Sequence, residues 1–239
     1  MPLLDFDSLV ICNKNYDISA LTSTLEFFRE LGIRKFIVTI DVDPLRASQY
    51  DVLNKYRDFK QAVLTQARPR SSIIRVAPSV LLEKDISLDP FLQRLRLSRT
   101  NKIFIRSPLL QDKSWTPEQL NYLLYKQKLK PIFVNFEYNL LSPDHEYRDQ
   151  LYRIEKAAYC LDINFMTKKL SEKHLKHALR EDLTIIPAVS NPLYAYDGSN
   201  RHFVIDSFNE LRDRIGSRTY LKICKQINVS TKKIFTFHS

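Results

Sequence analysis

Short apolar runs alternate along the whole chain with longer amphipathic segments. Seven runs rich in β-branched and aromatic residues predict strands, within residues 2–12, 35–39, 72–77, 102–106, 131–134, 160–165 and 184–189. Between them, apolar residues recur at helical spacing. This alternation predicts a parallel sheet, and the length of 239 residues without a linker favours a closed barrel. We therefore expect one α/β domain, a distorted seven-stranded parallel β/α barrel spanning residues 1–239.

Several expected helices have recognisable ends. Asp17 is a suitable cap for a helix over residues 18–31, and Gly32 a suitable stop. Thr116 can cap a helix that has Pro117 at its first position. Further helices are expected from residues 89 and 171, and over residues 50–67, 142–158, 206–215 and 219–227, followed by a separate closing segment over residues 230–237.

Composition narrows the class of protein. The three cysteines are odd in number and far apart, which indicates a reducing compartment and argues against a disulfide framework or a zinc site. No apolar stretch reaches membrane-spanning length and no signal peptide is evident, so we expect a cytoplasmic protein. With only three glycines, a glycine-built phosphate loop is excluded, and with it the dinucleotide and P-loop classes.

The net charge of +10 raises the question of a nucleic-acid partner. Lysines and arginines are spread over most expected helices and often stand beside acids, as in Glu172-Lys173. We therefore favour a solvated basic surface over a dedicated nucleic-acid groove.

Polar side chains follow several predicted strands, and chemistry in parallel α/β folds sits at the carboxyl ends of strands. Asp41 and Asp43 come directly after the second strand, and Asn135 and Glu137 follow the fifth. The two aspartates could hold Mg²⁺ or Mn²⁺ or act as acid and base. Equally, Asp43 could cap a turn before Pro44. Both interpretations stay open.

Other side chains are candidates for binding a ligand. Arg106, at the end of the fourth strand, and Lys14 could hold an anion, although a salt bridge is the commoner role for an arginine. The remaining candidates near expected strand ends are Asn164, Ser190 and Asn191.

Residues 131–139, Pro-Ile-Phe-Val-Asn-Phe-Glu-Tyr-Asn, resemble a motif of bacterial tyrosine phosphatases of the polymerase and histidinol phosphatase (PHP) family, of the capsule-regulating type. That motif reads Pro-Ile-Ile-Ala-His-Pro-Glu-Arg-Asn. Residues 25–39 are similar to the family's first helix and second strand, residues 5–9 stand in the place of its opening Asp-x-His-x-His, and residues 228–234 resemble its terminal helix. The resemblance implies a seven-stranded distorted barrel whose histidine-bound metal cluster activates water against a phosphate ester.

The metal-binding positions of that family are not kept. The residues standing in place of its metal and phosphate ligands are Asp7, Leu9, Val42, Asp43, Val80, Asn135, Tyr138 and the run Ser190-Asn191-Pro192-Leu193. Leucine and valine cannot bind a cation, and asparagine is a poor substitute for imidazole. Asp7, Asp43 and Glu137 could together hold at most one hard cation.

We therefore expect a catalytically inactive relative that has lost its metal cofactor and binds a protein partner or an anionic ligand at the barrel mouth. One alternative is a single-metal phosphoesterase that uses Mn²⁺ or Mg²⁺ at Asp7, Asp43 and Glu137. Another is an RNA-binding subunit, because degenerate barrels of this superfamily are also similar to a protein of ribonuclease P.

Overall fold

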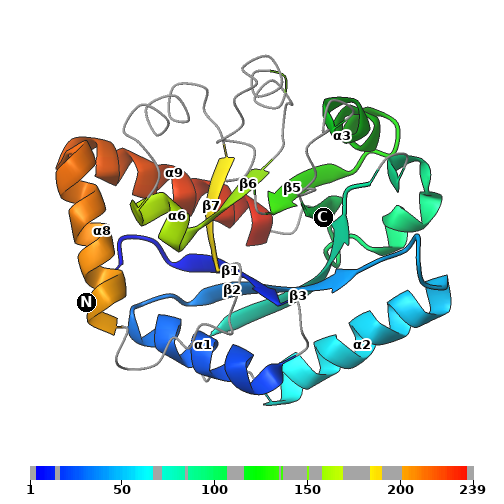
Figure 1. The fold of residues 1–239 in the computed structure, drawn as a ribbon, viewed down its shortest axis with the longest axis horizontal. Coiled ribbons are helices and arrows are strands. Elements are labelled where there is room, and N and C mark those ends of the chain that lie inside the picture. The colour runs from blue at the N-terminus through cyan, green and yellow to red at the C-terminus, as the bar shows by residue number, and fades with distance from the viewer. Residues whose placement is uncertain are drawn as a thin grey trace.

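The computed structural model of the protein is a closed barrel of parallel strands (Figure 1). It describes residues 4–13, 17–66, 72–83, 86–106, 116–134, 136, 150, 158–168, 184–189 and 201–235. Within these ranges, seven strands follow one another around the ring in chain order, and the last pairs with the first. They are β1 (Ser8–Asn13), β2 (Lys35–Val42), β3 (Ile73–Leu81), β4 (Lys102–Arg106), β5 (Lys130–Val134), β6 (Ala158–Asp162) and β7 (Thr184–Val189). The predicted α/β barrel is confirmed.

Helices pack around the barrel, with α1 and α2 on the side formed by β1, β2 and β3 (Figure 1). The described helices are α1 (Ile18–Glu30), α2 (Gln49–Gln66), α3 (Thr116–Tyr125), α6 (Ile163–Lys168), α8 (Arg201–Ile215) and α9 (Ser217–Phe235), with 3₁₀ turns η1 (Ile86–Leu88) and η2 (Pro90–Arg94). Asp17 caps α1 as predicted, because its side chain accepts a hydrogen bond from Ala20 N at 2.9 Å. Thr116 is the first residue of α3 instead of its cap.

Side chains alternate between the two faces of the barrel wall, as the period of a strand requires. In β2, Phe36, Val38, Ile40 and Val42 belong to the large cluster under the helices. Ile37 belongs to a second cluster inside the barrel, whose other strand residues are Val10, Cys12, Ala77, Phe104, Ile132, Val134, Ala158, Cys160, Ile186 and Ala188. This part of the barrel interior is therefore filled by packed side chains and is not a pore.

Two strands are longer than the sequence predicted. β2 continues to Val42, so Asp41 lies within the strand, and β3 continues to Leu81 through Pro78. By contrast β6 ends at Asp162, and the predicted strand end over residues 163–165 is wrong. Ile163 and Met166 are both buried and lie three residues apart, the spacing of one face of a helix, whereas a strand would point them to opposite faces.

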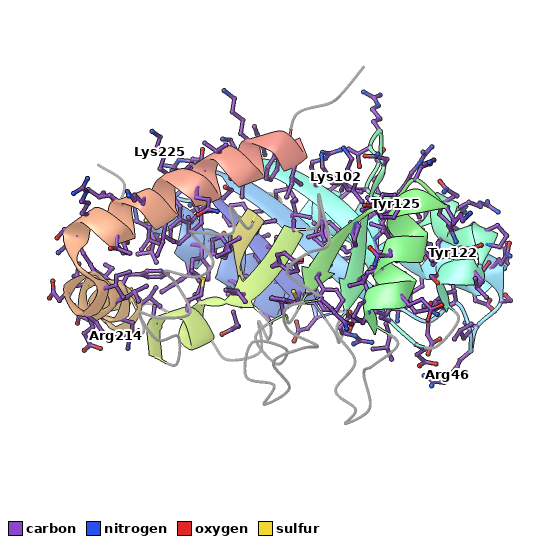
Figure 2. The ribbon with its side chains drawn as sticks, turned by 90° about the horizontal axis from the view of Figure 1, so that it is seen from above. Arg46, Lys102, Tyr122, Tyr125, Arg214 and Lys225 are labelled. Carbon is purple, nitrogen blue, oxygen red and sulfur yellow. The ribbon has the colours of Figure 1, made fainter. Side chains whose placement is uncertain are left out.

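A single helix, α9, closes the end of the barrel at which the strands begin, which we call the amino end (Figure 2). Its residue Ile234 packs with Leu97 in the interior cluster, and Arg75 Nη1 of β3 donates to Ile234 O at 3.0 Å. The predicted separate closing segment after residue 230 is thus part of this helix. Its buried residues Tyr220, Ile223, Cys224, Ile227, Thr231 and Ile234 keep helical spacing throughout.

All three cysteines are buried, and none of them forms a disulfide. In the part of the chain that the structure describes, no helix has the length and hydropathy needed to cross a membrane.

Candidate functional site at the barrel mouth

The carboxyl ends of the strands form the other end of the barrel, which we call the mouth. Here Arg106, the last residue of β4, forms an ion pair through Nη1 with Asp41 Oδ2 of β2. The two side chains are only 24% and 15% exposed. Ser79 of β3 is in register with Asp41, so the arginine reaches across the intervening strand. The mouth is therefore spanned by a guanidinium group held by a carboxylate.

Three buried polar atoms of this region have no hydrogen-bond partner among the described residues. They are Arg106 Nε, Ser79 Oγ and Thr39 Oγ1. Thr39 and Ser79 are 0% and 1% exposed, and both follow the inward alternation of their strands. A buried polar atom without a partner costs about 1–3 kcal/mol, so such a group in a folded protein calls for an explanation.

The guanidinium group of Arg106 carries one of these three atoms. Because Nη1 is the nitrogen bonded to Asp41, the side-on edge formed by Nε and Nη2 is not used by this ion pair. That edge presents two parallel N–H donors, the geometry that matches a carboxylate or phosphate. Nε, on this edge, has no partner among the described residues, and neither has the Ser79 hydroxyl on the neighbouring strand.

A second ion-pair cluster lies on the rim. Arg46 donates to Asp43 Oδ2 at 2.7 Å and lies 2.8 Å from Glu83 Oε1. Asp43 Oδ1 also accepts from the backbone N of Leu45 and of Arg46, both at 3.2 Å, so the predicted turn-capping role of Asp43 is confirmed. The hydrogen bond to Asp43, followed by the charge of Glu83, raises the pKa of Arg46. Figure 2 shows Arg46 at the edge of the molecule away from α9.

Asp7 does not lie at the mouth. It precedes β1, and its Oδ2 pairs with Lys35 Nζ at 2.5 Å, where β2 begins. Asp43 follows the other end of β2, eight residues further on, which places the two aspartates at opposite ends of the barrel. The expectation that both serve one cation is therefore wrong. The physical reason is register, because the strand starts after Asp7 and not before it.

Several sequence-based candidates fall outside the described residues, namely Lys14, Asn135, Glu137, Ser190 and Asn191. The backbone of Asn164 lies in α6, but its side chain is outside the description. Thr39, Ser79 and Glu83 were not predicted as site residues. The signal for Thr39 was present in the sequence, where Thr39 and Asp41 of β2 and Asp43 directly after it alternate with the outward apolar residues Ile40 and Val42.

The described mouth residues do not suit a divalent metal centre. Among the residues that the structure describes, no three His, Cys, Asp or Glu side chains come together as a cation site. Asp41 is engaged by Arg106 and by a bond from Lys55 Nζ to its backbone oxygen at 2.8 Å, and Asp43 is engaged by Arg46. A guanidinium at each of these carboxylates competes with a cation for the same oxygens.

Comparisons with known proteins show the fold of this chain and do not show its function. No family model matches the sequence, and no curated protein sequence matches it. Among solved structures, the barrel is similar to one from the crystal structures of YwqE from Bacillus subtilis and CpsB from Streptococcus pneumoniae, which are metal-dependent tyrosine phosphatases. The TM-score is 0.53 at 14% sequence identity, over 89% of this chain and 86% of that chain. This chain therefore has the seven-stranded barrel fold of metal-dependent tyrosine phosphatases, as its sequence motifs predicted.

Proposed function

We propose that the chain is a binding protein, which holds a small ligand bearing a phosphate or carboxylate group at the barrel mouth and does not hydrolyse it. The observation that supports this proposal is the side-on edge of Arg106, whose Nε is buried without a partner beside an ion pair that fixes the guanidinium. The fold shared with phosphatases is a scaffold on which a phosphate ligand is a reasonable occupant, but fold alone assigns no activity.

In this proposal each mouth residue has a separate task. Asp41 holds Nη1 and orients the guanidinium plane, Nε and Nη2 donate to two ligand oxygens, and the Ser79 hydroxyl donates to a third oxygen or to the ligand's substituent. Two charge-assisted hydrogen bonds contribute about 3–6 kcal/mol together. That corresponds to a Kd between roughly 6 mM and roughly 40 μM. A tighter complex is not expected, since Asp41 offsets the charge of Arg106.

Isothermal titration with inorganic phosphate and with phenyl phosphate tests the proposal. Arg106→Lys keeps the charge but removes the side-on donor edge, and we expect binding to weaken at least tenfold. Ser79→Ala leaves the ion pair intact, and we expect a loss of several-fold. Arg46→Lys on the rim is the matched control and should bind as the wild type does. No binding by the wild type, or equal losses in all three variants, would contradict the proposal.

Hydrolysis is tested separately. The purified protein is incubated with an aryl phosphate in the presence of Mn²⁺ or Mg²⁺, and we expect no turnover. Metal-dependent turnover that disappears in Asp43→Ala would contradict the proposed binding protein and support the single-metal phosphoesterase instead.

A further inference from the structure

The positive charge of the chain is concentrated in three segments that contain no aspartate or glutamate. Residues 94–102, residues 126–130 and α9 together hold twelve of the 37 lysines and arginines and none of the 27 acids. The rest of the chain holds the other 25 basic residues and all 27 acids, so it is slightly acidic. The expectation from the sequence that basic residues are evenly mixed with acids therefore fails for these segments.

The fold brings the three segments together at the amino end of the barrel. Lys102 and Lys130 are register partners at the starts of β4 and β5. Arg75 then joins the first segment to α9, because its Nη2 donates to Ser98 O at 2.5 Å and its Nη1 donates to Ile234 O. Burial, then the charges of Lys130 and Arg75, lower the pKa of Lys102. Like charges are thus gathered here despite their repulsion.

Exposed cations from these segments form what we call the basic face. Its members are Arg96, Arg99, Lys126, Lys128, Arg218, Lys222, Lys225 and Lys232. The last four recur at helical spacing along the outer side of α9, over a length of about 21 Å. Figure 2 shows Lys225 on the outer side of α9, with Lys102 at the same edge of the molecule and Arg46 at the opposite edge. Asp5 and Asp7 also lie near this end, and Asp7 is paired with Lys35.

Two exposed aromatic side chains adjoin the basic face. Tyr122 and Tyr125 of α3 are 37% and 55% exposed, and Tyr125 immediately precedes Lys126. Cations that track a phosphate backbone, next to aromatic rings on which bases stack, are the two components of single-strand binding. A helix lying on a membrane instead buries its apolar side in lipid. The apolar side of α9 is already buried in the protein, through residues such as Ile223 and Ile227.

We infer that the amino end of the barrel, opposite the proposed ligand site, binds single-stranded nucleic acid, with α9 contacting phosphates and the two tyrosines stacking on bases. If six of the cations contact phosphates, log Kd changes with log salt with a slope of about 4. Raising NaCl from 50 to 200 mM then weakens binding roughly 300-fold.

Fluorescence anisotropy with a fluorescein-labelled 20-nucleotide oligo(U) RNA and the full chain tests this inference. Lys222→Glu with Lys225→Glu should weaken binding at least tenfold at 50 mM NaCl and reduce the salt slope by about 1.4, the share of two lost contacts. Tyr125→Ala should weaken binding at least fivefold and leave the slope unchanged.

A matched control lies on α2, where Arg57→Glu with Lys60→Glu makes the same charge change at the same spacing. This pair should bind RNA as the wild type does, and so should Arg106→Lys, which separates the inference from the proposed ligand site. Absence of salt-sensitive RNA binding would overturn the inference, as would equal losses in the two charge-reversal pairs. Binding to vesicles of phosphatidylcholine and phosphatidylserine without binding to RNA would overturn it in favour of a membrane surface.

Discussion

Asn228 of α9 ties the last described helix to the segment that precedes the first strand. Its Nδ2 donates to Asp5 O at 3.0 Å, and its Oδ1 accepts from Asp7 N at 3.2 Å. Replacing Asn228 by alanine removes both bonds and leaves a backbone oxygen and a backbone N–H without these partners. Because the contact joins residues 223 positions apart, no local rearrangement of the helix can replace it.

The magnitude follows from the number and environment of these bonds. The bond from Asp7 N is partly buried and contributes about 1 kcal/mol net, and the exposed bond to Asp5 O contributes less, so losing both lowers the free energy of unfolding by about 1–2 kcal/mol. For a domain of this length, roughly 2–4 °C of Tm is lost per kcal/mol. We therefore expect the Tm of Asn228→Ala to fall by about 2–8 °C.

Urea denaturation followed by far-UV circular dichroism measures this change. Asn228→Asp keeps the acceptor and loses the donor, so it should lose about half as much stability. Val229→Ala, at the next and exposed position, should stay within about 0.5 kcal/mol of the wild type. If Asn228→Ala also stays within 0.5 kcal/mol, the two bonds do not fasten the start of the chain and the reasoning is refuted.

Three further outcomes are expected. Gln119→Leu removes the acceptor of the buried Ser87 N–H, at 3.1 Å, and of its hydroxyl, so urea denaturation should show a loss of about 2–4 kcal/mol. Burial raises the pKa of the Cys224 thiol from 9.0 to about 11, so the folded protein keeps the proton that the unfolded chain releases. The stability due to this group is therefore complete below pH 9 and is lost between pH 9 and 11, which the difference between wild-type and Cys224→Ala unfolding curves measures. Asp7→Asn breaks a partly exposed ion pair with Lys35 and should cost less than about 1 kcal/mol, with no effect on any Mn²⁺-dependent change in Tm.

Each of these outcomes has a clear contrary result. A Gln119→Leu variant as stable as the wild type would show that Ser87 finds another acceptor. Rapid reaction of Cys224 with a thiol reagent at pH 8 in the folded state would contradict a buried, protonated thiol. If the Mn²⁺-dependent change in Tm is lost in Asp7→Asn, Asp7 takes part in binding a metal and the pairing with Lys35 is not its only role.

Local sequence signals predicted much of the fold, because each strand is an apolar run between clear breakers. β4 and β7 were predicted with the bounds that the structure has. β2 and β3 were predicted too short, because Asp41 and Pro78 read as strand ends. Inside the barrel, however, Asp41 is stabilised by Arg106, a residue 65 positions away that no local pattern connects to it.

The candidate site was harder to predict because it depends on register. The sequence singled out Arg106 and Asp41, which the structure brings together, but it placed Asp7 at the wrong end of the barrel. Asp7 lies at the amino end because β1 runs from Ser8 to Asn13 and so follows this aspartate, whereas the family motif had placed it at the end of the first strand. Ser79 was missed since a single serine in an apolar strand resembles any buried hydroxyl until its lack of a partner is visible. The cytoplasmic location and the extent of the domain over the whole chain stay predictions.

Closure of the ring also determines the order in which the fold can form. Val10 of the first strand pairs with Ala188 of the last, and α9 then fastens the start of the chain through Asn228. These contacts need residues 188 and 228 to have been synthesised, so β1 leaves the ribosome long before its second neighbour is available. Pairing between such distant segments is slow because loop entropy is lost before the contacts form. During synthesis one edge of the sheet therefore stays unpaired and can pair with other chains until β7 covers it.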